Sequence, residues 1–227
     1  MTKSSSSINA GGATLRKERG RGRGAPVVER LRVHFEEGSR TTFAVALDWP
    51  GWCRRGAAAE AALESLEAYR PRYLAVVGGT GLPGEVEIVG RVCGNSTTDF
   101  GAPGAIGSWD EDPIEPGEMR RQALVVAACW SYFDATAAAA PAALRKGPRG
   151  GGRDTAGIVA HVRETEHVYA SKVGIRMPRS VNWEERRSAL MKSLVSDTSA
   201  TNWPRVYALR RVAWHLLDHA WEIQDRS

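Results

Sequence analysis

The spacing of apolar residues changes to a helical period near residue 117, and this change decides which folds the chain can form. Beyond Glu118, apolar side chains recur every three or four residues, at Met119, Ala123, Val126, Trp130 and Phe133. The sequence predicts four helices, over Glu118–Ala143, Thr155–Val173, Trp183–Val195 and from Asn202 onward. We expect them to form an antiparallel four-helix bundle over residues 117–227, because this arrangement buries four apolar faces together.

Polar residues at two of the predicted helix starts can serve as caps. Asp154 or Thr155 can cap the second helix, since either side chain accepts a hydrogen bond from the first turn. Asn202 is expected to cap the fourth helix, with Pro204 tolerated in the first turn.

Residues 27–93 show the two-residue alternation of β-strands instead. Strands are predicted over Leu31–Phe35, Phe43–Leu47 and Glu85–Val89, with a helix over Ala57–Tyr69 and a short helical stretch over Tyr73–Val77. This order predicts a small N-terminal β-β-α-β domain, and hence an α+β fold for the chain. His34 falls on the polar side of the first strand, so we expect it at the surface and exclude it as a metal ligand.

A segment rich in glycine and proline separates these two units. It runs from Cys93 to Pro116 and includes Gly94, Gly101, Pro103, Gly104, Gly107 and Pro113. Because these residue types interrupt helices and strands, we predict a linker without regular structure over residues 94–116.

The formal net charge of +5 is confined to the N-terminus. Residues 1–26 contain six Lys/Arg and one acidic residue, whereas the remainder contains 25 basic and 25 acidic residues. Residues 1–26 are therefore predicted to be a disordered basic tail. A neutral body argues against a specific nucleic-acid partner, because such proteins concentrate basic residues on a folded face.

Neither membrane insertion nor secretion is indicated by the sequence. No apolar run approaches the roughly 18 residues of a membrane span, and no secretory signal is recognisable, so we expect a cytoplasmic protein without a membrane partner. The cysteines Cys53, Cys93 and Cys129 are odd in number and far apart, which argues against a disulfide framework and a thiolate zinc site.

Three histidines lie in apolar helical stripes and could share one metal ion. His215 and His219 are four residues apart, which places both rings on one face of the fourth helix, beside Leu216 and Ala220. A zinc-like ion needs about three protein ligands when water completes its coordination. His161 lies in the apolar stripe of the second helix and is the expected third ligand, whereas His167 faces elsewhere and is rejected.

Buried histidines also occur without metal, each satisfied by an ordinary hydrogen bond. Two histidines at this spacing therefore remain compatible with a structural role in the core. Three imidazoles in apolar stripes favour a shared cation, because unpaired buried polar groups cost about 1–3 kcal/mol each.

The C-terminal half resembles the DinB-like (DinB/YfiT) metal-binding four-helix bundles. The resemblance is carried by Ile158–Val162 and Glu166 in the second helix and by His215-x-x-x-His219 in the fourth. It implies a mononuclear centre of His161, His215 and His219. Members of this family include thiol-cofactor S-transferases, such as mycothiol-dependent isomerases, and metal hydrolases, so the resemblance implies a metal site and not a particular substrate. We expect the partner to be a small-molecule substrate.

The chemistry of such a centre follows from its open coordination position. A divalent ion, with zinc or nickel as the leading candidates, can bring the pKa of a bound water to about 7 or deprotonate a bound thiol, for instance that of mycothiol. Glu164 and Glu222 each lie one turn after a histidine and are candidate catalytic proton acceptors, although either can equally be a solvated carboxylate. Arg149 and Arg153 are candidates for binding an anionic substrate.

Residues Phe43–Tyr69 resemble HicB-like antitoxin domains. In that pattern a strand ends at Pro50–Gly51, the chain passes Gly56, and a helix begins with Glu60 and two alanines. The resemblance implies an alternative to catalysis, in which the N-terminal unit mediates protein association, including homodimer formation, and the histidines stabilise the bundle with or without a metal.

Overall fold

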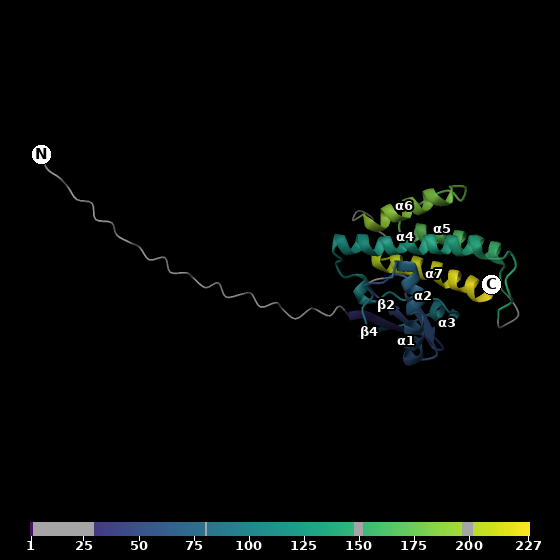
Figure 1. Cartoon of the computed structure of the whole chain (residues 1–227), viewed down its shortest axis with the longest axis horizontal. Helices are drawn as coiled ribbons and strands as arrows, with labels where there is room; N and C mark the ends of the chain where they lie inside the picture. Colours follow the sequence, from purple (N-terminus) through teal and green to yellow (C-terminus); the bar gives the residue numbers. More distant parts are fainter. Residues whose placement is uncertain (2–29, 80, 148–151, 197–201) are drawn as a thin grey trace.

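The computed structural model describes residue 1 and residues 30–79, 81–147, 152–196 and 202–227. The elements are β1 (Arg30–Glu37), β2 (Thr42–Ala46), β3 (Cys53–Gly56), α1 (Ala59–Ala68), α2 (Arg70–Val77), β4 (Glu85–Cys93), α3 (Ser96–Phe100), the 3-10 turn η1 (Ser108–Asp110), α4 (Pro116–Ala139), α5 (Thr155–Lys172), α6 (Trp183–Val195) and α7 (Arg205–Arg226). In Figure 1 the sheet with α1 to α3 lies on one side and the four long helices lie on the other. The predicted α+β class is confirmed. The predicted basic tail lies, except for its first residue, outside the described residues.

The sheet has four strands in the order β3-β2-β1-β4. β1 pairs antiparallel with β2, with Val33 opposite Ala46, and parallel with β4. The predicted hairpin is therefore present, but β3 was not predicted. After the turn that ends near Trp52, Cys53 pairs with Val45 and extends the sheet by a short antiparallel strand.

Both faces of β1 and β2 are covered, which corrects the expectation for His34. One face contributes Leu31 and Phe35 to the main hydrophobic core, while on the other face Val45 packs with Trp214 of α7. His34 is only 3% exposed, and its ring lies 4.5 Å from that of Trp109. Alternation identifies two sides of a strand, but here the segment before α4 and helix α7 bury the polar side as well.

The segment between the two units contains regular structure, so the prediction of an irregular linker was wrong. Asn95 caps α3: its Oδ1 accepts from the Thr97 amide at 2.8 Å, and the Asn95 amide donates to Thr98 Oγ1 at 2.8 Å. This reciprocal cap satisfies amides that would otherwise lack partners, so a short helix forms despite the flanking glycines. Gly104 N donates to the buried Glu36 at 2.7 Å and ties the segment to the sheet.

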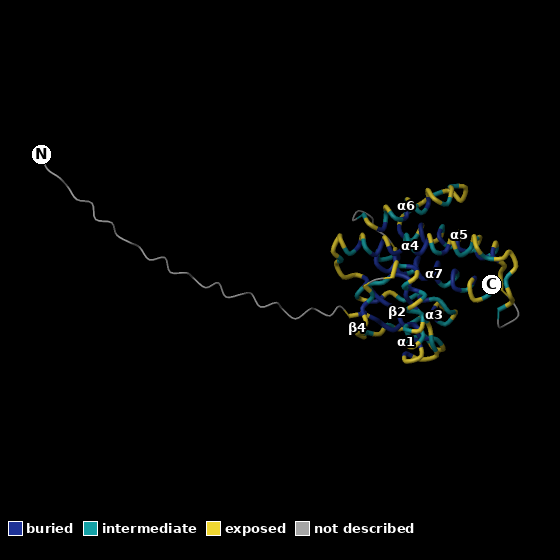
Figure 2. The backbone as a smooth tube through the Cα atoms, viewed as in Figure 1, coloured by how far each residue is buried: buried dark blue, intermediate teal, exposed yellow. Residues whose placement is uncertain are grey.

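The four long helices pack against one another, with α7 contacting α4, α5 and α6. The predicted apolar positions of the first helix, from Met119 to Phe133, are buried, as is Cys129. The bounds of α6 agree with the prediction, whereas α4 ends at Ala139 rather than Ala143. One hydrophobic cluster joins these helices to the sheet unit, and Figure 2 shows buried backbone along α7 where the two meet.

Trp52 and Tyr73 illustrate this continuous core. Their rings stack at 5.1 Å, Trp52 Nε1 donates to the Leu66 carbonyl at 2.9 Å, and the Tyr73 hydroxyl donates to the Pro50 carbonyl at 2.9 Å. Their polar atoms are thus satisfied within the apolar core. Within the described residues, none of the helices combines the length and hydropathy that crossing a membrane requires.

Candidate metal centre

Helix α7 presents His215 and His219 at the side that faces α5. The helix buries Val212, Leu216 and Ala220, in agreement with the predicted stripe, and His215 itself is 6% exposed. The predicted cap was wrong: Pro204 occupies the N-cap position and the helix begins at Arg205. Proline can occupy this boundary because its missing amide removes an unpaired donor.

Helix α5 supplies the third histidine. Its start agrees with the prediction, because the Asp154 carboxylate accepts from the Gly157 amide at 2.7 Å and caps the first turn. Ile158 and Val162 are buried and fix the helix against the core. His161 lies at the flank of this buried face, half-buried and directed toward α7.

The three imidazoles converge on one point. The Nε2 atoms of His161 and His215 are 3.2 Å apart, and the ring centres of His215 and His219 are 4.6 Å apart. One ligand nitrogen from each of the three rings lies within 4.8 Å of the other two. The predicted convergence is therefore confirmed, and no other such group of three is found among the described residues.

The geometry fits a divalent ion bound by imidazole nitrogens. Zinc–nitrogen bonds of about 2.0–2.1 Å in a tetrahedral site place two ligand nitrogens about 3.3 Å apart. The observed 3.2 Å between His161 and His215 is close to this value.

Burial favours the neutral form, which metals require, for two of the rings, His215 and His161. Desolvation lowers the pKa of His215 well below its usual value, and the neighbouring His219 and His161 lower it further. The pKa of His161 is lowered for the same leading reason. Neutral imidazoles do not have to release a proton before binding a cation.

Glu222 and Arg226 orient the third histidine. Glu222 Oε2 lies 2.8 Å from His219 Nδ1, and Arg226 Nη1 donates to Glu222 Oε1 at 2.5 Å. The hydrogen bond from His219, ahead of the effect of Arg226, lowers the pKa of Glu222, so the carboxylate is ionised. A carboxylate on Nδ1 fixes the tautomer and leaves Nε2 free for a metal.

Arg226 also holds the loop that precedes α5. Its Nη2 donates to the Arg153 carbonyl at 2.7 Å and its Nε donates to the Arg145 carbonyl at 2.8 Å. The loop is thereby tied to the helix that carries two of the histidines. Arg226 was not among the predicted site residues, although its position four residues after Glu222 is a signal for this pairing.

The structure does not bring Glu164 to the histidines. It accepts from Arg179 on the exposed surface, and its side chain is 49% exposed. Since Ile158 and Val162 define the buried face of α5, Glu164 points to the opposite side of the helix. Asp218 likewise pairs with Arg54, at 3.3 Å, and not with a histidine.

The two arginine candidates have different outcomes. Arg149 lies outside the described residues. Arg153 is exposed, and its backbone carbonyl accepts from Arg226 Nη2 at 2.7 Å. His167 lines a separate groove with Arg163 and Trp183, in agreement with its rejection as a ligand.

Comparisons of the chain with family models, with curated proteins and with solved structures find no significant match. The resemblances to DinB-like bundles and to HicB-like domains therefore rest on sequence motifs alone.

Proposed function

We propose that the protein is a DinB-like enzyme dependent on a divalent metal ion, with His161, His215 and His219 as the three ligands. The supporting observation is the convergence of three imidazoles from two helices, with ligand nitrogens within 4.8 Å of one another. Without a cation, the acceptor nitrogens of these three neighbouring rings would find few hydrogen-bond donors. Zinc and nickel are the favoured ions, since both suit imidazole ligands.

The reaction class that this site favours is transfer of a thiol cofactor, such as mycothiol, or hydrolysis of a small substrate. When bound, the ion would lower the pKa of a water or thiol at its open position. Glu222 holds His219 through Nδ1 and is a positioning residue in this scheme. Glu164 has no role in it, because its carboxylate is directed away from the histidines.

Metal analysis of the purified protein tests this proposal. We expect about one equivalent of zinc or nickel per chain by plasma mass spectrometry after extensive dialysis, and less than about one tenth of that in His215→Ala, because two remaining ligands rarely hold an ion. His167→Ala is the matched control, since it removes a histidine of α5 outside the cluster. Wild-type protein that retains no metal would refute the proposal.

The edge strand β4 favours a second candidate function, association with another copy of this chain. β4 is nine residues long, ends the sheet, and exposes 44% of Ile88. An unpaired strand edge can pair with the same strand of a second molecule. Light scattering after size-exclusion chromatography would show a dimer that Ile88→Pro converts to a monomer. A wild-type monomer at high concentration would exclude this association.

A further inference from the structure

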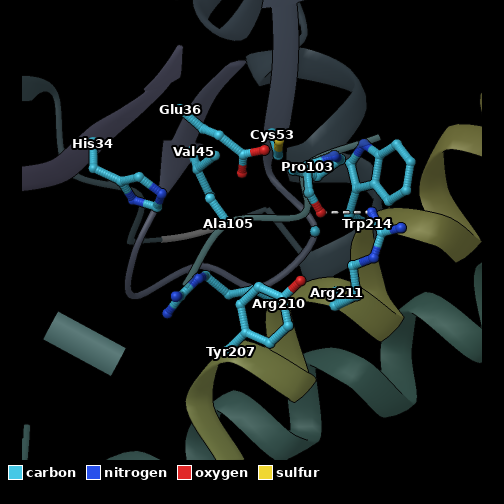
Figure 3. A pocket seen from close by; sticks show the side chains of 11 residues that line it. His34, Glu36, Val45, Cys53, Pro103, Ala105, Tyr207, Arg210, Arg211 and Trp214 are labelled. Atoms are coloured by element: carbon cyan, nitrogen blue, oxygen red, sulfur yellow. Dashed lines mark hydrogen bonds between the residues drawn. The ribbon is translucent and has the colours of Figure 1, made fainter. Parts of the chain in front are cut away.

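Two cavities lie between the sheet unit and α7, and they differ greatly in size. In the enclosed cavity of Figure 3, Glu36 and Tyr207 point toward each other, and about 20 Å³ is open to water, which is room for about one water molecule. The second cavity is a groove of about 780 Å³, where the edge strand β3 meets the C-terminal half of α7. This volume is usual for small-molecule sites. Of the two, only the groove has room for an organic ligand.

Three parts of the chain form the walls of this groove. The sheet unit contributes β3 and the end of α1, the helices contribute the last turns of α7, and the segment after α4 contributes Arg145 and Lys146. Hydrogen bonds join this segment to α7: the Arg145 amide donates to the Arg226 carbonyl at 2.8 Å, and Arg145 Nη2 donates to the Asp225 carbonyl at 2.7 Å. These two walls are therefore joined by contacts within the chain.

Positive charge exceeds negative charge in the groove. Each carboxylate that lines it is paired with an arginine, and the pairs are Asp218 with Arg54 at 3.3 Å, Asp225 with Arg72 at 2.8 Å, and Glu222 with Arg226 at 2.5 Å. In contrast, no ion pair among the described residues includes Arg55, Arg145 or Lys146, which also line the groove. These unbalanced charges favour a ligand that carries more than one negative charge.

Two buried nitrogens of the lining side chains lack a hydrogen-bond acceptor. Arg54 Nε and Trp221 Nε1 have no partner within the described structure, although Trp221 is only 1% exposed and buried donors are usually paired. The Arg54 guanidinium is held in place by its pair with Asp218 and by the Tyr69 ring, whose centre lies 3.8 Å from Arg54 Cζ. Both unsatisfied groups are donors, so these walls match a ligand rich in oxygen acceptors.

We propose that this groove binds a small phosphorylated molecule, whose phosphate is bound by Arg55, Arg145 and Lys146. A phosphate monoester carries a charge of about −1.5 to −2 at pH 7 and offers three strong acceptor oxygens, which matches the excess positive charge and the missing acceptors. A monocarboxylate would balance less of this charge. The site is separate from the candidate metal centre, because none of the three histidines is among the residues that line the groove.

Calorimetric titration of the full chain with pyrophosphate tests the proposal. The protein is first freed of metal, since pyrophosphate also binds metal ions, so the result does not depend on the candidate metal centre. We expect saturable binding of one pyrophosphate per chain, with a Kd that rises at least about tenfold in the double variant Arg55→Met/Lys146→Met, which removes two charged donors. Both side chains are exposed and make no hydrogen bond to another described residue, so this variant should fold as the wild type does.

Arg120→Met/Arg176→Met is the matched control. It removes the same total charge from two exposed residues that lie outside the groove and outside the ion pairs of the described residues. We expect it to change the Kd for pyrophosphate less than about twofold, because charges beyond about 8 Å are largely screened at physiological salt.

Several results would overturn the proposal. A wild-type protein that binds no pyrophosphate would exclude the site, and an unchanged Kd in Arg55→Met/Lys146→Met would exclude this groove as its place. Equal weakening in the control variant would indicate attraction by net charge alone. Acetate that competes with pyrophosphate as well as inorganic phosphate does, at equal ionic strength, would overturn the phosphate class. Tighter binding of a short single-stranded DNA than of pyrophosphate would overturn a small-molecule ligand.

Discussion

Helix α5 contributes to two buried groups of ionisable side chains that satisfy burial in opposite ways. His161 meets two further histidines of the same kind, whereas Glu166, five residues later, meets groups that complement it. Glu166 is 1% exposed, accepts from Trp130 Nε1, and lies 3.5 Å from Arg187 Nε. Arg187 also makes a forked pair with Asp134, at 2.6 and 3.2 Å.

This difference identifies which of the two groups requires a ligand from outside the chain. Glu166, Arg187 and Asp134 form a group in which opposite charges are paired within the chain, although Glu166 Oε2 and Arg187 Nε make no hydrogen bond. The histidine cluster contains three rings of one type, of which two approach to 3.2 Å, and burial lowers the pKa of His215. Such a cluster is stabilised most by a cation. This contrast can be tested by removing the metal ion, by deprotonating Glu166 or by replacing Glu222, the carboxylate that orients His219.

The largest effect is expected from the metal. Zinc at about 1,000 times its Kd should raise the free energy of unfolding by about 4 kcal/mol, because it binds only the native arrangement of the three rings. Thermal unfolding with zinc and with a chelator would measure this. Glu166→Gln should retain the full zinc effect and His215→Ala should lose it. An identical melting temperature with zinc and with chelator would contradict the comparison.

The second effect concerns the pH dependence of stability at Glu166. Burial, opposed by the charge of Arg187, raises its pKa from 4.5 to about 7. The native state therefore binds more protons than the unfolded state between these values, and this carboxyl lowers stability as pH rises through that window, by roughly 3 kcal/mol in total.

Urea unfolding of wild type and Glu166→Gln at pH 5 and pH 8 would isolate this contribution. The variant should gain stability relative to wild type at the higher pH, since the amide cannot ionise. Both proteins contain His215, whose lowered pKa makes stability fall as pH drops below the ordinary histidine range. Comparing their free energies of unfolding at each pH therefore cancels the contribution of this histidine. A difference that is the same at both pH values would show that Glu166 is ionised throughout.

The smallest effect comes from the carboxylates beside the histidines. Glu222→Gln should weaken zinc binding about 10–100-fold, because its carboxylate orients His219 through Nδ1. Glu164→Gln, one turn after His161 but on the exposed side of α5, should leave zinc affinity unchanged within about twofold. Competition titration with a chromophoric chelator measures both. Equal losses of zinc affinity in the two variants would indicate a long-range effect of the carboxylate charge and would argue against orientation of His219 by Glu222.

Periodicity predicted the helices well but failed where distant segments meet. The bounds of α6 and the burial of Ile158 and Phe133 follow from local spacing and capping, which act over a few residues. His34 was assigned to the surface because alternation cannot show that a later segment covers both faces of a strand. Helix α3 was missed because composition suggested breakers, while the reciprocal cap of Asn95 and Thr98 decided the local structure.

The candidate site shows the same division. The spacing of His215 and His219 and the apolar stripe around His161 are local properties, so the three candidate ligands could be chosen from residue order and helix geometry. Residue order could not show that Glu222 lies beside a histidine whereas Glu164 does not, since both follow a histidine by three residues. Only the direction of each helix face distinguishes them. The four-residue spacing of Glu222 and Arg226 indicates their pairing, but that the same carboxylate also contacts His219 Nδ1 needed the side-chain conformations of the packed helix.

Residue order by itself therefore determined the helical period, the helix cap at Asp154 and the shared helix face of His215 and His219, because these depend on interactions within one or two helical turns. Only the tertiary structure decided the 3.2 Å approach of His161 to His215 and the burial of His34. Each of these depends on how segments at least 50 residues apart pack, and close packing in three dimensions is not encoded in any single stretch of the chain.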